Sequence, residues 1–251
     1  MRSVLFIMVL SSLLQAQWKK EYSPEVEAFM QIVEEKYQTL SSVEDELILS
    51  DAELEDAMRK MYFAIAEDPD GYANYIQQHY QKQGEDYKKG ILSLEKPTLG
   101  TIIGKLERKI ADRFSNALVK SIRTSYFLRV KVIGINYYFD NDNKYRKGNI
   151  IKCEILDVIK GKSKYKIGDI IEFKYSNQSL CVLQYFIDDI YFIPFVYYKN
   201  LYPAWYACTG NFLIKDNIIQ CPYEVFEIQE NLLWEDFKEK FEDNLLISRK
   251  E

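Results

Sequence analysis

The side chain best suited to acid–base chemistry in this chain is its single histidine, His79. Any Ser-His-Asp or Cys-His arrangement must use it, because the sequence holds no second imidazole. His79 falls on a predicted helical face with Tyr75 and Tyr80, and nothing in the sequence places a nucleophile or a set of metal ligands beside it. We therefore interpret His79 as a packing residue, and we expect a non-enzymatic chain with no catalytic residue, no metal and no cofactor.

Paired carboxylates, which could serve as an acid and a base, occur at Asp188-Asp189 and at Asp68 and Asp70. The second pair lies in an Asp-Pro-Asp-Gly sequence that has the acidic start of a calcium loop. An EF-hand needs glycine at its sixth position and glutamate at its twelfth, where this chain has alanine and histidine. We interpret both pairs as turn residues. A hydrolase that uses acidic residues alone is a further hypothesis, which loss of activity without unfolding in a single Asp or Glu variant would support.

Residues 1–16 have the layout of a secretory signal peptide, with Arg2, an apolar run from Val4 to Leu14, and Ala16 as a small residue for cleavage before Gln17. A membrane-spanning helix needs roughly 20 apolar residues, and this run is much shorter. An uncleaved anchor is therefore the weaker interpretation. We expect a secreted or periplasmic protein with no membrane span after cleavage.

The four cysteines are Cys153, Cys181, Cys208 and Cys221. An exported chain meets an oxidising compartment, so we expect these residues to form two disulfides. Their spacing contains no CxxC pair, which excludes a zinc site of that type. Free buried thiols are the alternative, and they suit a cytosolic chain better.

The composition is that of a folded, mildly acidic protein. Hydrophobic residues make up 47% of the chain and charged residues 28%, which is typical of a globular domain. The formal net charge of −5 gives no general attraction to nucleic acid or to an anionic lipid surface. We therefore expect no nucleic-acid partner. The aromatic content of 15% favours β-structure and protein-binding surfaces.

The first half of the chain has helical periodicity. Ser23 can cap one helix, with Pro24 at its first position, and Ser50 and Glu53 form a capping box at the start of a second helix. A third helix is expected over 72–80, followed by a polar linker over 83–89. A fourth, longer helix is expected from 97 to 118, with one apolar face that continues through its whole length.

At residue 126 the period changes from helical to alternating. Strands are expected over 126–135 with a bulge at Gly134, and over 151–155, 170–175 and 191–198. A hairpin over 205–221 is expected to turn at 215–217. Pro194 removes a ladder donor, so its strand is expected at an edge or at a bulge. A last helix is expected to begin at an Asn231 cap and to present an apolar face made of Leu233, Trp234, Phe237, Phe241 and Leu245.

These elements predict an α+β fold. A signal peptide at 1–16 is followed by a helical region over 17–121, a small OB-type β-barrel over 122–228 and a C-terminal helix over 229–251. Five or six short strands joined by turns favour a closed or partly open barrel.

Between about 126 and 222, the order of elements resembles the netrin-like fold shared by tissue inhibitors of metalloproteinases. The segments that carry this resemblance are Val130-Lys131-Val132-Ile133-Gly134, the strand from Cys153 that ends in Lys160-Gly161, Gly168-Asp169-Ile170-Ile171, Ser179-Leu180-Cys181, Tyr191-Phe192-Ile193 and Ala207-Cys208-Thr209-Gly210.

The resemblance implies an OB-type barrel and a disulfide between Cys181 and Cys208. Cys153 and Cys221 are then left to pair with each other. The inhibitors of that family chelate zinc through a cysteine at the mature N-terminus, where this chain has Gln17 instead. What the resemblance implies is therefore the fold rather than that inhibitory mechanism.

We expect an exported, non-catalytic module that binds another protein through the barrel or through an aromatic loop. Five aromatic residues flank Pro203 between two strands, and such residues are enriched at interfaces. Strand alternation places about half of them inside the barrel, so a binding face and core packing both remain open. The five are Tyr197, Tyr198, Tyr202, Trp205 and Tyr206. The alternative function is a protease inhibitor that uses a surface other than the N-terminus.

One basic cluster consists of Lys160, Lys162, Lys164 and Lys166. We interpret it as a solvated hairpin loop, because alternating lysines commonly face water. A site for a sulfated or other anionic polymer is the alternative.

Overall fold

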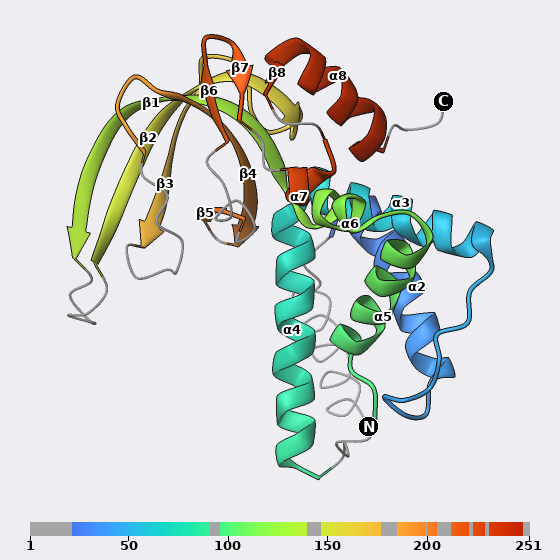
Figure 1. The fold of residues 1–251 in the computed structure, drawn as a ribbon. Coiled ribbons are helices and arrows are strands. Elements are labelled where there is room, and N and C mark those ends of the chain that lie inside the picture. Colours follow the sequence, from blue (N-terminus) through green and yellow to red (C-terminus); the bar gives the residue numbers. More distant parts are fainter. Residues whose placement is uncertain are drawn as a thin grey trace, which may run out of the picture.

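The computed structural model describes residues 22–90, 96–139, 147–176, 185–198, 200–204, 212–220, 223–228 and 231–247. Helices gather on one side and a curved antiparallel sheet lies on the other, with α4 (Pro69–Lys88) running beside the sheet (Figure 1). The mixed α+β class is therefore confirmed. No helix within these ranges combines the length and the apolar character needed to cross a membrane.

The first two described helices begin at the caps that the sequence predicts. Ser23 precedes α2 (Pro24–Thr39), and its hydroxyl accepts a hydrogen bond from the Val26 N–H at 3.3 Å. Ser50 and Glu53 form a reciprocal capping box at the start of α3 (Asp51–Glu67). Both caps satisfy N–H groups that have no partner within the first turn of a helix, and both predictions are confirmed.

Helix α4 is longer than predicted, because the expected linker over 83–89 is helical as far as residue 88. The polar composition that indicated a linker belongs instead to a helix that is largely solvated over its last turns. The acidic Asp68-Pro69-Asp70-Gly71 sequence ends α3 as predicted, but the turn interpretation is wrong for its last three residues, which form the first turn of α4. Asp68 ends α3, and its carboxylate accepts hydrogen bonds from the N–H groups of Gly71 at 2.8 Å and Ser23 at 3.2 Å.

The predicted fourth helix is two helices, α5 (Leu99–Arg113) and α6 (Asn116–Arg123). The chain breaks at Phe114 because Ser115 adopts an extended conformation and caps α6, its hydroxyl accepting from the Leu118 N–H at 3.0 Å. A serine hydroxyl offers the backbone this alternative to continued helical bonding.

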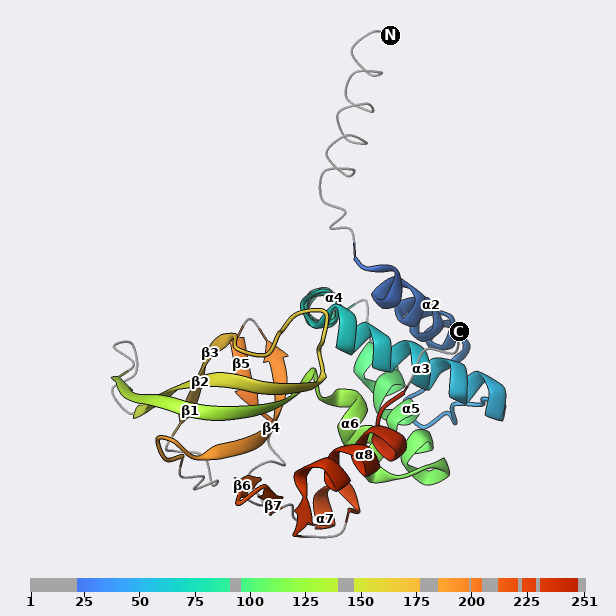
Figure 2. The same cartoon turned by 90° about the horizontal axis from the view of Figure 1, so that it is seen from above.

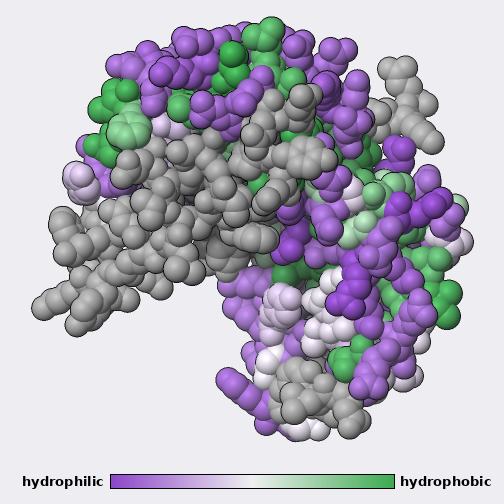
Figure 3. Space-filling view, in the orientation of Figure 1, coloured by the Kyte–Doolittle hydropathy of each residue, from purple (hydrophilic) through white to green (hydrophobic). Residues whose placement is uncertain are grey.

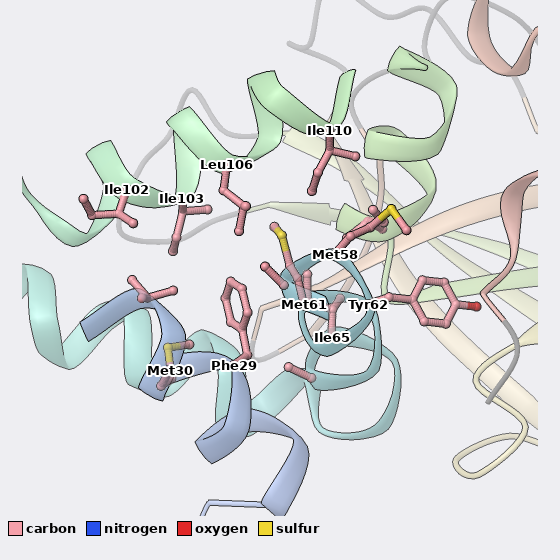
Figure 4. Packing of buried hydrophobic residues seen from close by; sticks show 14 of the residues in the cluster. Phe29, Met30, Met58, Met61, Tyr62, Ile65, Ile102, Ile103, Leu106 and Ile110 are labelled. Carbon is pink, nitrogen blue, oxygen red and sulfur yellow. The ribbon is translucent and has the colours of Figure 1, made fainter. Parts of the chain in front are cut away.

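The helical unit, defined here as α2 to α6, has its own apolar core. Its buried side chains interdigitate between α2, α3 and α5, as Figure 4 shows. Tyr62 points away from most of this cluster and toward the strands (Figure 4). Members of the cluster buried to within 2% of complete burial include Phe29, Val33, Met61, Leu106 and Ile110.

The sheet unit, defined here as β1 to β8 with α7 and α8, is antiparallel throughout. Its strand order is β3-β2-β1-β4-β6-β7-β8, and β5 also pairs with β4. Its elements are β1 (Tyr126–Phe139), β2 (Lys147–Lys160), β3 (Ile170–Ser176), β4 (Ile190–Tyr198), β5 (Asn200–Pro203), β6 (Leu213–Lys215), β7 (Ile218–Ile219), α7 (Tyr223–Phe226), β8 (Leu232–Leu233) and α8 (Trp234–Leu245).

An OB-type barrel is not confirmed, because the sheet does not close. Strands β3 and β5 lie against each other, but no ladder joins them within the described residues. The outer side of β4 is shared between the short β5 and the short β6, which pair with different ends of it. Neither strand therefore runs the full length of β4 toward β3.

Two sequence signals in the strands have different outcomes. The bulge is confirmed, since the β1–β2 register shifts between Val132 and Gly134. The edge position expected for Pro194 is wrong, because β4 lies between β1 and the β5/β6 pair. The Phe192 N–H donates toward β6, to the Phe212 carbonyl at 2.9 Å. By strand alternation the Pro194 nitrogen points to the same side of β4 as the Phe192 N–H. At Pro194 neither β6 nor β5 pairs with β4 on that side, so the proline removes no hydrogen bond from the ladder.

The two faces of the sheet carry separate cores. Residues from β1 to β5 fill the inner face, among them Val130, Cys153 and Phe173. The other face packs against α8, where Phe127 and Phe192 contact a group of buried aromatic rings. The rings that α8 contributes are Trp234, Phe237 and Phe241.

The cap expected for α8 is wrong, although its apolar face is confirmed except at Leu233. Asn231 has a positive φ of 57° and precedes β8. Leu233 occupies the cap position without a side-chain hydrogen bond and is half exposed. The helix start is held instead by the Trp234 N–H, which donates to the Asn217 carbonyl at 2.8 Å.

Asn217 belongs to the two-residue β6–β7 turn. In this turn Asp216 and Asn217 have positive φ values of 51° and 60°, as a type I′ hairpin requires. The hairpin turn is therefore confirmed.

Gly161 gives the first test of this packing. Its φ is +101°, and an added Cβ would overlap the ring of the buried Tyr126. We expect Gly161→Ala to lower the free energy of unfolding by at least about 2 kcal/mol. The control is Gly84→Ala, at a helical position where an added Cβ would have no heavy atom within 4 Å. We expect this variant to raise the free energy of unfolding by about 0.5–1 kcal/mol. Urea unfolding measures both, and equal stability of the two variants would contradict the packing described at Gly161.

Candidate functional site

A groove of about 1120 Å³ lies where the helical unit meets the sheet unit. Its volume is slightly above the range of about 300–1,000 Å³ that is usual for small-molecule sites, which favour junctions between structural units. The residues that line it come from α3, α4, α5, α6, the link from α6 to β1, β4 and the segment after α7. They are Ile65, Pro69, Tyr72, Ala73, Ile76, Gln77, Tyr80, Gln81, Gly100, Ile103, Gly104, Glu107, Asn116, Val119, Lys120, Arg123, Ser125, Val196, Tyr197 and Glu227.

The two long walls are stripes of α4 and α5. Lining positions on α4 recur every three or four residues from Pro69 to Gln81, so they share one helix face. On α5 the wall includes two glycines. The Tyr80 hydroxyl covers Gly100, where an added Cβ would overlap it, whereas no heavy atom lies within 4 Å of an added Cβ at Gly104. At Gly104 the groove therefore reaches the helix backbone.

The end of the groove nearest the sheet is built around Tyr197 of β4. Its backbone N–H donates to the Ser125 hydroxyl at 3.0 Å. Partial burial, together with the charge of Asp70 and a hydrogen bond to it, raises the pKa of the Tyr197 phenol. Lys164 lies 3.7 Å from the Asp70 carboxylate and 5.2 Å from the centre of the Tyr197 ring. These contacts join β4, the start of α4 and the β2–β3 connection.

Polar groups line the groove near α6. The Arg123 Nε lies 3.4 Å from the Glu107 Oε1 atom, and the Glu107 side chain is only 18% exposed. Burial raises the pKa of Glu107, while the Arg123 charge opposes that rise. Lys120 donates to the Val225 carbonyl at 3.4 Å. The groove thus combines an apolar length with charged groups of both signs at one end.

Behind this end, Lys160 holds the two units together. Its side chain is buried at the end of β2, and its ammonium donates to the carbonyls of Ser121 at 2.9 Å, Ile122 at 3.3 Å and Thr124 at 2.6 Å. The same nitrogen lies 4.0 Å from the centre of the Tyr62 ring on α3. Carbonyls at a helix C-terminus lack helical partners and carry partial negative charge, which favours a cation there.

The interpretation of the lysine cluster as a solvated loop is therefore wrong for Lys160, because β2 carries that residue into the unit junction. Burial lowers the pKa of the Lys160 ammonium, an effect that its three carbonyl acceptors and the aromatic ring oppose. Lys162, Lys164 and Lys166 are exposed, as the loop interpretation expects.

The structure places the expected aromatic binding residues apart. Tyr197 is half-buried in the groove, whereas Tyr202 lies on β5 at 37% exposure and is absent from the groove lining. The side chain of Tyr198, and all of Trp205 and Tyr206, fall outside the described residues.

The cysteine predictions have one described outcome. Cys153 is a free thiol, buried beside its register partners Val132 and Ile171, and burial raises its pKa to about 12. The expected Cys153–Cys221 disulfide is not formed in this structure. Cys221, Cys181 and Cys208 lie outside the described residues, as do the expected signal peptide and its cleavage site.

His79 packs as the sequence predicts. Its ring stacks on Tyr75 with centroids 4.3 Å apart, and the Tyr75 hydroxyl hydrogen bonds to Glu34 of α2 and lies 3.3 Å from the His79 Nε2 atom. Burial raises the pKa of Tyr75, so its hydroxyl stays protonated at neutral pH. Within the described ranges no group of three or more His, Cys, Asp or Glu residues could hold a metal ion.

No protein-family model, no curated protein and no solved structure matches this chain. The site therefore rests on geometry alone. The groove lining on α5 and α6 was missed by sequence reasoning. Two signals could have indicated it. One is the glycine pair at 100 and 104, and the other is the recurrence of Tyr72, Ile76 and Tyr80 at helical spacing.

The Lys160 contacts predict a large cost for its removal. Lys160→Met removes the buried cation and its three hydrogen bonds to carbonyls at the junction, so we expect the free energy of unfolding to fall by about 3 kcal/mol. The control is Lys162→Met, whose side chain is 70% exposed and whose ion pair with Glu242 spans 4.0 Å. We expect the control to change stability by less than about 0.5 kcal/mol. Denaturant unfolding compares the two variants. A Lys160 variant as stable as the control would contradict the stabilising role of Lys160 at the junction of the two units.

The environment of His79 predicts a pH effect. Burial lowers its pKa below 6.5, although the Glu34 carboxylate opposes this and Lys82 adds to it. The unfolded chain then takes up a proton near pH 6.5 before the folded chain does, so stability falls as pH drops through about 6.5. In His79→Gln this part of the pH dependence should disappear. Thermal unfolding at pH 7.5 and 5.5 measures it, and identical pH profiles for the two proteins would contradict the assignment.

Proposed function

We propose that this chain is an exported, non-catalytic binding module that holds an amphipathic helix of a partner protein in the groove between its helical and sheet units. The observation that carries this proposal is the groove itself. Its two long walls are faces of α4 and α5, and Tyr197 lies at the end nearest the sheet. Tyr197 was already expected to contact a partner, which links the groove to the predicted binding surface.

The shape of the groove favours a helix as its occupant. The α4 wall runs roughly 18 Å from Pro69 to Gln81 at a rise of about 1.5 Å per residue, which matches about three helical turns. Helices that bind in grooves use apolar anchors three and four residues apart. The partly buried Ile76 and Val119 provide apolar surface for such anchors. Gly104 lets the helix of the partner approach the α5 backbone closely, because glycine has no side chain to separate them.

The charged end favours an amphipathic occupant over a wholly apolar one. Glu107 and Arg123 face each other inside the groove, and Lys120 and Glu227 line it nearby. A polar helix face with charges of either sign can meet these groups, whereas an apolar ligand would remove them from water without adding a hydrogen-bond partner.

The sheet unit fits a module of this kind. We propose that it is a netrin-like, partly open barrel, and the order of β1 to β5 together with the approach of β3 to β5 supports this. The resemblance implies only the Cys181–Cys208 pair, so the free thiol of Cys153 does not count against it.

The test uses fluorescein-labelled amphipathic peptides of about 18 residues, long enough to hold some helix in water. The panel carries a leucine stripe and a neutral, acidic or basic polar face. We expect saturable binding by fluorescence anisotropy to the native protein, and an affinity at least 10-fold weaker for Gly104→Trp, whose indole fills the open wall.

The matched control is Gly84→Trp, the same change at another exposed helical glycine with open space around it and outside the groove. It should bind as the native protein does, and both variants should keep the native melting temperature. The proposal fails if no peptide of the panel binds, or if the two tryptophan variants bind equally well.

A further inference from the structure

The outer half of β1 has an unpaired edge. Strand β1 pairs with β4 only from Tyr126 to Lys131, whereas its pairing with β2 continues to Phe139. Val132 makes the last bonds on the β4 side, donating to the Asp189 carbonyl at 3.0 Å and accepting from the Asp188 N–H at 2.8 Å. Beyond it, the described residues supply no ladder partner on that side. In Figures 1 and 2 this end of β1 lies far from the helices.

The sequence of this edge lacks the features that usually protect an edge strand. Residues 133–139 read Ile-Gly-Ile-Asn-Tyr-Tyr-Phe, without a charge or a proline. The paired half of β1 carries Arg129 and Lys131. Edge strands are normally blunted by lysine, by proline or by bulges along the strand. In the half of β1 that lacks a partner on the β4 side, the register with β2 shifts only at its start, between Val132 and Gly134.

Exposed apolar side chains surround the start of the edge. Ile133 is 38% exposed and Tyr137 is 78% exposed on the strand itself. The turn that holds Val132 carries Phe186 at 56% and Ile187 at 57%. Figure 3 shows hydrophobic residues reaching the surface over the sheet among hydrophilic ones. Several large apolar side chains close to one unpaired edge indicate a surface that is covered in the working state.

We propose that the free edge of β1, residues 134–139, pairs antiparallel with the same edge of a second copy of this chain. Unpaired backbone N–H and C=O groups in a row bind an extended strand, which sets the chemistry of the partner. A two-fold axis places the segment opposite itself, so each copy supplies the same surface.

Self-pairing meets no electrostatic obstacle here. An uncharged segment opposite itself brings no like charges together, and isoleucine and tyrosine pair favourably across strands. At the start of the edge, Lys131 and Asp188 neutralise each other in an ion pair at 2.8 Å, and the Asp189 carboxylate accepts a hydrogen bond from the Tyr191 hydroxyl at 3.3 Å. The groove is lined by α3 to α6 and β4 rather than by β1, so the proposal is independent of helix binding.

The interface is small. Six strand residues extend about 20 Å at about 3.4 Å each, and interfaces below about 1,200 Å² of total buried surface are usually transient. We therefore expect a reversible dimer whose population rises with protein concentration.

Sedimentation equilibrium over a range of protein concentrations tests the proposal. The native protein should move from monomer to dimer mass as concentration rises, and Asn136→Lys should weaken the dimer at least 10-fold, because it sets two lysines near each other across the new ladder. The matched control is Asn200→Lys, the same change at an exposed position of β5, which should dimerise like the native protein.

Amide hydrogen exchange gives a readout that does not depend on any variant. Exchange of residues 134–139 in the native protein should slow as concentration rises, while exchange in α4 should not change. A native protein that stays monomeric at millimolar concentration would overturn the proposal. So would a dimer that Asn136→Lys and Asn200→Lys weaken equally, or one without protection at 134–139.

Discussion

The arrangement of the two units depends on the burial of one charge. The Lys160 ammonium leaves water at the end of β2, where it meets three carbonyls at the C-terminal end of α6 and the face of the Tyr62 ring. Burying a charge without partners is very unfavourable, so these contacts fix both the position of the lysine and the position of the helix that satisfies it. Gly161 then turns the chain against Tyr126, where a side chain would not fit.

The groove follows from that junction. Once α6 is held against the end of β2, Arg123 and Ser125 lead directly into β1, and β4 brings Tyr197 to the start of α4. The contact of Asp70 with Lys164 and Tyr197 adds a second link between the units. The concave site is thus formed between the helical unit and the sheet unit, each of which contains apolar packing of its own.

Local signals in the sequence predicted local structure well. The caps at Ser23 and Ser50, the bulge before Gly134 and the hairpin turn at 216–217 were all identifiable, because each depends on neighbours along the chain. Long-range packing was not identifiable. Lys160 reads as one of four alternating lysines, and only the approach of α6 and Tyr62 shows why it is buried. Pro194 reads as an edge marker, although the gap between β5 and β6 accommodates it inside the sheet. The groove was missed for the same reason, since its walls are distant in sequence.

The most direct test of the central claim is methyl NMR of the native protein during titration with the amphipathic helical peptide. Ile76 and Ile103 line the groove, whereas Ile151 and Ile171 lie in the sheet core away from it. The structure predicts that the methyl signals of the first pair shift and those of the second pair do not. Shifts confined to Ile151 and Ile171, or no shifts at saturating peptide, would contradict a helix-binding groove at the junction of the two units.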